Sequence, residues 1–335
     1  MTLTRRTFMA AGSAVLLMPG GAHAADVADD AGRALAAPAK VRRVFPAGPA
    51  AAILLYTLAP ELLLGWPRAN TRQACAYLLR DVCERPALAD TADPVLATAL
   101  HSDLILEVGT IDASDASRAE RVQRQTGIPY ALLDGRFLSL STSYEKLGKL
   151  IGRALDGLDF ADYCNMTLSV ITNRIAFVPR EHRTRVYYAR GPRGLTTALG
   201  GASQMETIEL LAVNVAGETQ GGLADVSNER VLAWNPHVIV ATDRDFAASV
   251  RGNAAWAGTD AVKNGRVHLS PRLPFGWVDS PPSANRLIGL WWLAKTFYPA
   301  LFKEGMRELT RDFHARFYHV TPSAEQIERV LAAAD

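Results

Sequence analysis

Short strand-like runs alternate with helical segments along this chain, and this alternation restricts the fold more than any other feature. The runs are rich in Val, Ile, Leu and Tyr and lie at 41–45, 62–67, 103–108, 129–133, 185–190, 238–241 and 266–269. A helix is expected from about Ala50 to Leu58, between the first two runs. Because alternating strands and helices form parallel sheets covered by helices, the sequence predicts an α/β fold.

The stretch from Leu158 to His182 separates the two sets of runs and has no strand pattern of its own. Apolar residues recur there near helical spacing, which predicts one long helix ending before Pro179. The chain is also longer than one core usually supports. We therefore expect two doubly wound lobes with mostly parallel sheets, joined by one long α-helix. The predicted parts are an N-terminal lobe at 41–157, a linking helix at 158–182 and a C-terminal lobe at 183–335.

Segments 95–106 and 229–240 share a pattern of helix end, polar turn and buried strand. An internal match at this separation favours two similar lobes. The alternative is that any unit of helix and strand shows the same pattern.

The N-terminus has the pattern of an export signal. Arg5 and Arg6 precede a short apolar run from Met9 to Met18, and Ala22-His23-Ala24 follows. This pattern predicts a signal peptide at 1–24, and the paired arginines indicate the twin-arginine type. The apolar run is too short to span a membrane. We expect a periplasmic protein whose mature chain does not insert into the membrane.

Charge and cysteine content exclude some classes of protein. Without residues 1–24, the 36 Lys and Arg lose Arg5 and Arg6, which leaves 34 against 34 Asp and Glu. This balance argues against a nucleic-acid partner. Cys75 and Cys83 are eight positions apart, so either a disulfide or two buried thiols fits the spacing, which matches no zinc pattern.

The segment SNERVLAWNP at 227–236 carries a resemblance to a known family. It is similar to an acidic helix start before a turn in the substrate-binding proteins of ABC importers for iron–siderophore complexes, haem and cobalamin. A degraded counterpart at 95–103 and the order of parts behind an export signal extend the resemblance over roughly 41–330. The resemblance implies two α/β lobes bridged by a long helix, a monomer, and an inner-membrane ABC permease as partner.

In that family an exposed Glu on each lobe docks onto basic residues of the permease. Glu229 matches the position in the C-terminal lobe. The position in the N-terminal lobe falls on Val95, which departs from the pattern, and Asp93 lies close enough to substitute. The alternative for Glu229 is a solvated charge that favours the helix dipole and needs no partner.

Aromatic and basic residues follow the predicted strands, where doubly wound sheets bind their ligands. The candidate ligand-binding residues are Trp66, Arg68, Thr110, Arg136, Tyr188, Arg190, Phe275 and Trp277. Aromatic faces and guanidinium groups suit a bulky anionic ligand. Alternatively, the aromatic residues belong to the core and the arginines pair with acids across the cleft.

The segment LPFGWVDSPPSANR at 273–286 contributes the last two candidates, and of these we favour Trp277 over Phe275 as a cleft wall. Ser280 is expected to cap a helix with Pro281 at its first position. The apolar run from Leu287 to Leu293 is expected to pack inward.

No resident metal or covalently bound cofactor is expected. His314 and His319 are five positions apart, which does not suit a metal pair on a helix, and we expect both at the surface. Common enzyme motifs are absent, so we do not expect an enzyme. The sequence predicts a binding protein for a metal chelate, most simply a ferric siderophore carried as an Fe(III) complex. Haem, cobalamin or an oxyanion such as molybdate are alternatives, as is a periplasmic enzyme.

Overall fold

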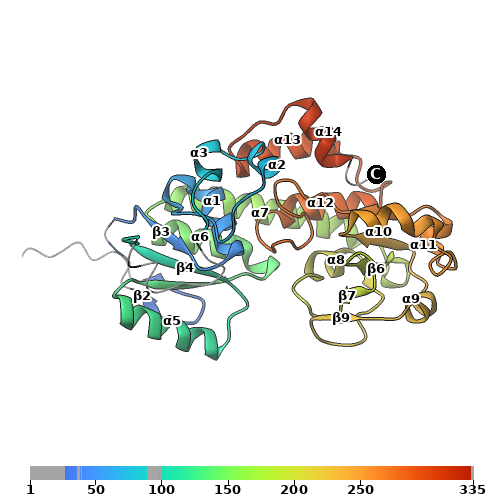
Figure 1. Ribbon diagram of the computed structural model, residues 1–335, viewed down its shortest axis with the longest axis horizontal. Coiled ribbons are helices and arrows are strands. Elements are labelled where there is room, and N and C mark those ends of the chain that lie inside the picture. The colour runs from blue at the N-terminus through green and yellow to red at the C-terminus, as the bar shows by residue number, and fades with distance from the viewer. Residues whose placement is uncertain (1–26, 36–37, 39, 89–97, 99, 333–335) are drawn as a thin grey trace, which may run out of the picture.

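The computed structural model describes residues 27–332 apart from 36–37, 39, 89–97 and 99. It contains two α/β lobes side by side, each built on a parallel sheet (Figure 1). The predicted fold class is therefore confirmed. The predicted signal segment lies outside the described residues, as do residues 95–97 and 99 of the internal match.

The N-terminal lobe has a parallel sheet in the order β3-β4-β5. Its strands are β3 (Val44–Pro46), β4 (Leu104–Gly109) and β5 (Tyr130–Asp134). Helices α1 (Pro49–Leu58), α5 (Ala113–Thr126) and α6 (Leu140–Leu150) pack around it. Its apolar strand residues are buried because helices cover both faces of a parallel sheet. A short antiparallel pair, β1 (Val27–Ala28) and β2 (Ala34–Leu35), precedes the sheet.

The strand predicted at 62–67 does not form. A 3₁₀ turn spans Pro60–Leu62, and only single bridge pairs follow, at Leu63 and Trp66. The Arg85 guanidinium donates to the carbonyl oxygens of Pro60, Glu61 and Leu63. These carbonyls are satisfied by a side chain instead of a neighbouring strand, so the segment stays irregular.

The C-terminal lobe has a four-stranded parallel sheet in the order β11-β10-β6-β8. Its strands are β6 (Arg185–Ala189), β8 (Val213–Asn214), β10 (Val238–Ala241) and β11 (Val267–Leu269). A separate antiparallel pair joins β7 (Thr196–Ala198) and β9 (Leu223–Asp225). The helices of this lobe are α8 (Glu206–Leu211), α9 (Asn228–Trp234), α10 (Arg244–Ser249), α11 (Asp260–Lys263) and α12 (Arg286–Phe297).

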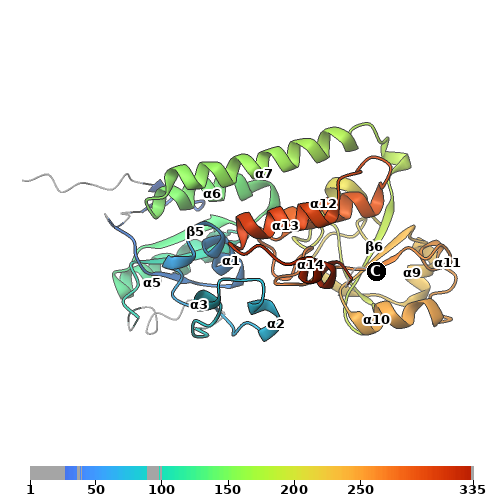
Figure 2. The ribbon, with the colours of Figure 1, turned by 90° about the horizontal axis from the view of Figure 1, so that it is seen from above.

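The long helix α7 (Ala154–Ile175) runs along both lobes (Figure 2). It starts earlier than the predicted span of 158–182 and also ends earlier, at Ile175. The chain leaves the helix at Ala176, and a 3₁₀ turn at Arg180–His182 follows Pro179. The helical conformation is disfavoured for a residue that precedes proline, which is consistent with a helix that ends ahead of Pro179.

The C-terminal helices return to the N-terminal lobe, which the boundary of 183–335 did not anticipate. Phe317, at the end of α13 (Met306–Phe317), packs on Tyr144, Phe160 and Tyr163. Helix α14 (Ala324–Leu331) follows, where the carbonyl of Gln326 accepts from the Tyr77 hydroxyl at 3.0 Å. One continuous apolar core therefore crosses from lobe to lobe.

Helices α6 and α7 approach closely at two glycines. A Cβ on Gly157 would lie 2.6 Å from the carbonyl oxygen of Tyr144 and 3.1 Å from the Cα of Gly148. Gly157→Ala is expected to lower the free energy of unfolding by about 1–2 kcal/mol, because backbone atoms cannot move aside cheaply. Urea denaturation measures the change. Gly252→Ala, where a Cβ meets open space, is the matched control and is expected to stay within about 0.5 kcal/mol of the parent.

Cys75 and Cys83 form a disulfide, which resolves the two alternatives left by their spacing. The bond connects α2 (Arg72–Cys75) to α3 (Arg80–Cys83), two short helices that follow the irregular segment. Cys164 is a buried free thiol in α7. Within the described residues, no helix combines the length and the apolar character needed to cross a membrane.

Candidate ligand-binding cleft

Two adjoining cavities lie between the lobes at the carboxyl ends of the parallel strands. The larger, of about 510 Å³, is bounded by Thr242 after β10, by Ser270 after β11 and by residues of the 69–74 segment. The smaller, of about 320 Å³, is bounded by Pro49 at the start of α1 and by Trp66. Both are lined by Ala69, Asn70, Phe275 and Ser280. Doubly wound sheets bind ligands at this edge, so the two cavities form the candidate cleft.

A larger cavity of about 850 Å³ lies elsewhere, among β11, α12, α13 and α14. One of its walls is Arg266, which directly precedes β11 and therefore marks the amino end of that strand. Its position is opposite to the edge where α/β sheets place their ligands. The two cavities between the lobes are therefore the candidate ligand site.

Arginine side chains from both lobes line the cleft. They are Arg68, Arg244, Arg272 and Arg329, and no Asp or Glu is among the described lining residues. Arg272 Nη1 donates to the carbonyl oxygen of Thr242 at 3.0 Å. A guanidinium carries five N–H donors, so this bond leaves Arg272 able to bind an anion as well. The excess of positive charge favours an anionic ligand.

Three of the predicted residues meet in the smaller cavity: Trp66, Arg68 and Phe275. The two aromatic rings lie 5.8 Å apart between centroids, and both side chains are largely buried. The Trp66 indole N–H donates to the carbonyl oxygen of Val82 at 2.8 Å, which fixes the ring. Trp66 and Phe275 thus belong to the core and also form an aromatic wall of the cleft.

Tyr188 and Arg190 do not line the cavities, which corrects their prediction as ligand contacts. Tyr188 is fully buried, as is Tyr187, and burial raises the pKa of the Tyr188 hydroxyl well above its usual value. Arg190 donates to the Tyr188 hydroxyl and forms an ion pair with Asp279. The buried carboxylate of Asp279 needs a charged partner, which Arg190 supplies.

Asp279 connects this ion pair to the cleft. Its Oδ1 accepts a hydrogen bond from the Ser280 hydroxyl at 2.8 Å, and Ser280 lines both cavities. Arg190 therefore holds the cleft wall in place without touching the ligand space. Pairing with an acid, one of the two alternatives considered from the sequence, is the outcome for this arginine.

Trp277 is fully buried, so the preference for it as a cleft wall over Phe275 is wrong. A Cβ on Gly289 of α12 would clash with the carbonyl oxygen of Trp277, which shows how closely the helix packs on this residue. The expected helix start at Ser280 and Pro281 is also wrong, because α12 begins at Arg286. The apolar run from Leu287 to Leu293 is buried, as predicted.

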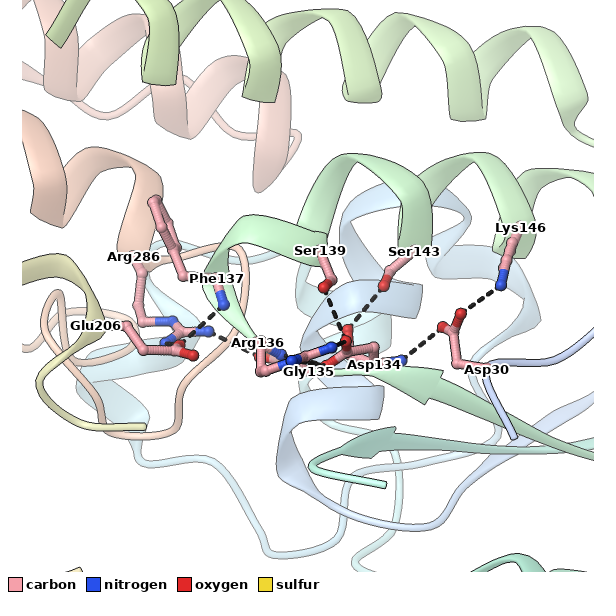
Figure 3. Close-up of polar contacts among 10 residues, drawn as sticks. All are labelled: Asp30, Asp134, Gly135, Arg136, Phe137, Ser139, Ser143, Lys146, Glu206 and Arg286. Carbon is pink, nitrogen blue, oxygen red and sulfur yellow. Dashed lines mark hydrogen bonds and ion pairs between the residues drawn. The ribbon is translucent and has the colours of Figure 1, made fainter. Parts of the chain in front are cut away.

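Thr110 and Arg136 are exposed at the ends of β4 and β5, and neither lines the cavities. Arg136 makes a bidentate pair with Asp134, which also accepts from the Ser139 hydroxyl at 2.8 Å (Figure 3). The guanidinium of Arg136 is thus already paired with the carboxylate of Asp134, two positions earlier in the sequence.

A buried ion pair beside this group connects the lobes. Arg286, with a side chain only 1% exposed, contacts Glu206 Oε2 at 2.6 Å and donates to the carbonyl oxygen of Gly135 at 2.8 Å (Figure 3). The same Glu206 oxygen accepts from the backbone N–H of Phe137 at 2.9 Å. Glu206 and Arg286 belong to helices of the C-terminal lobe, whereas Gly135 and Phe137 follow β5 of the N-terminal lobe. The network therefore holds the two lobes in a fixed orientation relative to each other.

Glu229 lies exposed in the first turn of α9, after the cap residue Ser227. A hydrogen bond from the Ser227 side chain lowers the pKa of Glu229, so its carboxylate is ionised at neutral pH. This placement is compatible with docking. Asp93 and Val95 lie outside the described residues.

The expected surface position of His314 is wrong. Its ring is fully buried beside Tyr77 and Tyr318, and burial lowers its pKa to about 3. His319 is half-buried, with Nε2 3.1 Å from the carbonyl oxygen of Tyr56. In the described part of the chain, no cluster of three or more His, Cys, Asp or Glu is placed to hold a metal ion.

Sequence reasoning missed several residues of the cleft and its support: Asn70, Arg244, Arg329 and Arg286. Arg244 follows β10, so its position after a strand could have identified it as a candidate. Arg329 belongs to α14, and its approach to the cleft depends on the return of the C-terminal helices. No local pattern marks that return.

Comparison with known proteins agrees with this architecture. The periplasmic binding protein family matches residues 99–272. The molybdate-binding protein MolA of Haemophilus influenzae is 26% identical over 245 residues, which cover 72% of this chain. The matched region covers 65% of MolA, which is less than two thirds of the length of that relative.

Solved structures agree in fold. An ABC transporter solute binding protein from Sulfurospirillum deleyianum superposes with a TM-score of 0.83 and 24% identity, covering 91% of this chain and 98% of that chain. Molybdate-bound MolA of Haemophilus influenzae superposes with a TM-score of 0.73 and 20% identity, covering 89% of this chain and 98% of that chain. The family match spans half of the chain and confirms the resemblance seen in the sequence: this protein belongs to the periplasmic binding protein family.

Proposed function

We propose that this protein captures an anionic metal chelate, most simply a ferric siderophore, between its lobes and delivers it to an ABC permease in the inner membrane. The ligand brings its metal already coordinated, and the protein performs no bond chemistry. The N-terminal signal pattern supports a periplasmic location reached by the twin-arginine route. Release follows docking on the permease.

The observation that carries this proposal is the lining of the cleft. Four arginines face two adjoining cavities that no described carboxylate lines, and Trp66 and Phe275 supply aromatic surface. Guanidinium groups bind carboxylate or catecholate oxygens through charge-assisted hydrogen bonds, and the aromatic rings pack on the flat parts of a chelator. A bulky anion uses both features at once.

Molybdate is the second candidate, favoured by the similarity to MolA. A compact oxyanion would use the arginines and the hydroxyl groups of Thr71, Ser270 and Ser280. It would make little use of the aromatic wall in the smaller cavity. The two candidates therefore differ in their dependence on Trp66 and Phe275.

Titration of purified protein distinguishes the candidates. Tryptophan fluorescence and calorimetry are followed while Fe(III) tris-catecholate, ferric citrate, haem, cobalamin and molybdate are added in turn. We expect micromolar or tighter binding of at least one ferric complex, and a loss of about tenfold or more in Phe275→Ala. Binding of molybdate alone, unchanged in Phe275→Ala, would establish the second candidate. Absence of binding by all five compounds would refute both.

Docking through Glu229 gives a separate prediction. Glu229→Lys is expected to leave ligand affinity unchanged, because the exposed residue does not line the cleft, while ligand uptake into cells that carry the cognate permease falls about tenfold or more. Asp245→Lys, which reverses an exposed acid in the first turn of α10, is the matched control. Uptake equal to that of the parent protein would exclude a docking role for Glu229.

A further inference from the structure

The two cavities of the cleft differ in chemistry. The described lining of the larger cavity includes three arginines: Arg244, Arg272 and Arg329. In the described lining of the smaller cavity Arg68 is the one charged residue, and the apolar side chains are those of Pro49, Ile53, Trp66, Pro67, Phe275 and Pro281. A ligand that fills both cavities therefore presents anionic oxygen atoms at one end and apolar surface at the other.

Asn70 and Ser280 mark the place where the two cavities meet. Each lines both cavities, and the other two shared residues, Ala69 and Phe275, are apolar. Asn70 precedes α2 in the N-terminal lobe, whereas Ser280 belongs to the loop between β11 and α12 in the C-terminal lobe. A ligand that extends from one cavity into the other therefore meets one polar side chain from each lobe.

The side-chain amide of Asn70 has a donor that the protein does not use. Its Nδ2 atom is buried and has no hydrogen-bond partner among the described residues. A buried N–H without an acceptor is unfavourable, and an oxygen atom of the ligand at this position would remove that cost. Asn70 therefore favours a ligand with a hydrogen-bond acceptor at the junction of the cavities.

The Ser280 hydroxyl has the opposite preference. It donates its proton to Asp279 Oδ1 at 2.8 Å, because a carboxylate paired with Arg190 can only accept. The Ser280 oxygen keeps lone pairs that accept a hydrogen bond, so it favours a donor on the ligand. Carboxylate, catecholate and molybdate oxygens carry no proton and satisfy only Asn70. A secondary amide carries one acceptor and one donor and satisfies both residues.

We propose that the ligand is a two-part chelate whose halves are joined by a secondary amide at Asn70 and Ser280. The anionic ferric head lies in the larger cavity, and an apolar arm lies against Trp66 and Phe275 in the smaller. The amide carbonyl accepts from Asn70 Nδ2, and the amide N–H donates to Ser280 Oγ. This assignment depends on the proposed capture of a ferric complex and specifies which complexes the cleft selects.

Three ferric complexes test the amide linker. The chelators are citrate, citrate with one terminal carboxyl converted to a benzylamide, and the corresponding benzyl ester, and each complex is titrated calorimetrically. The amide and the ester share the benzyl arm, the charge and the carbonyl oxygen, but only the amide has an N–H donor. We expect the parent protein to bind the amide complex about tenfold or more tightly than the ester complex and than ferric citrate, because a site built for a donor rejects an analogue without it.

Substitutions separate the two hydrogen bonds. Ser280→Ala is expected to reduce the preference for the amide over the ester to within about twofold, while Ser270→Ala, which removes a hydroxyl from the larger cavity alone, keeps it. Asn70→Leu is expected to weaken the amide and ester complexes alike, by about tenfold, and to leave ferric citrate unchanged. Gln73→Leu, which removes a side-chain amide from the larger cavity alone, is the matched control and is expected to leave the ratio of the amide to the ferric citrate affinity unchanged.

The affinities of the parent protein decide the outcome. Equal affinity for the amide and ester complexes, or no binding of the amide complex, would overturn the amide-linked ligand. A preference for the amide that survives in Ser280→Ala would overturn the hydrogen bond assigned to this residue. Equal affinities here together with binding of a ferric complex in the earlier titration would leave the proposed function in place, whereas absence of binding by every ferric complex would refute that function as well.

Discussion

Arg286→Ala is expected to lower the free energy of unfolding by about 3–5 kcal/mol. The guanidinium is almost completely buried, and its bonds reach Glu206, the carbonyl oxygen of Ser203 and that of Gly135. Removing it leaves the carboxylate of Glu206 without its charged partner and two carbonyl groups without a donor. Urea denaturation followed by circular dichroism measures the loss.

Arg136→Ala is the matched control for this prediction. Arg136 also pairs with a carboxylate, in the same region, but its side chain is 65% exposed. Exposed ion pairs contribute about 0–1 kcal/mol, so this change is expected to be small. Equal effects of the two substitutions would contradict the role assigned to Arg286.

A second substitution at the ion pair of Arg286 and Glu206 distinguishes a role in stability from a role in orienting the lobes. The double variant Arg286→Met with Glu206→Gln removes both charges and keeps most of the volume. It is expected to recover much of the stability lost in Arg286→Ala, because the uncompensated charge is gone. If ligand affinity in the double variant stays low despite recovered stability, the ion pair also sets the angle between the lobes. Small-angle scattering of the two proteins measures that angle.

The second large effect concerns ligand affinity. Arg272→Gln is expected to weaken binding of the tightest ferric complex by about 10–100-fold, since a charge-assisted hydrogen bond contributes about 1.5–3 kcal/mol. The loss is also expected to depend on salt, because the interaction is between an exposed cation and an anionic ligand. Calorimetric titration at low and high ionic strength measures both quantities.

Arg251→Gln is the control for Arg272→Gln. Both arginines are exposed and both donate to a backbone carbonyl oxygen, Arg272 to Thr242 and Arg251 to Gly265. Arg251 does not line the cleft, so its loss is expected to leave affinity unchanged. Equal affinity of the parent protein and both variants would contradict the arginine-lined cleft as the anion site.

Local patterns predicted most of the sheet, because buried parallel strands are continuous apolar runs bounded by turns. The runs at 103–108, 129–133 and 238–241 correspond closely to β4, β5 and β10. The run at 62–67 has the same composition but makes only single bridge pairs, Leu63 with Val44 of β3 and Trp66 with Ala87. Arg85, from more than twenty positions away, donates to the carbonyl oxygens of Pro60, Glu61 and Leu63 at its start, and no pattern in the run itself indicates that interaction.

The candidate site divides in the same way. Strand-end reasoning located the edge of the sheets and identified Trp66, Arg68 and Phe275, which line the cleft. Between Phe275 and Trp277, two positions apart in one loop, it favoured the wrong residue. Burial of Trp277 is set by the close approach of α12 at Gly289, twelve positions further along the chain.

The sequence by itself therefore determined the α/β class, the two lobes, the long linking helix and the sheet edge at which the candidate cleft lies, because each depends on the periodicity or composition of a continuous segment. Only the tertiary structure decided which arginines line the candidate cleft and which acids pair with them. Arg190 is held by Asp279 and Arg286 by Glu206, while Arg329, which pairs with Glu325 of its own helix, reaches the cleft on a helix that returns from the end of the chain. Those outcomes depend on charges and packing that meet across long distances in sequence, and a guanidinium takes whichever carboxylate the fold brings to it.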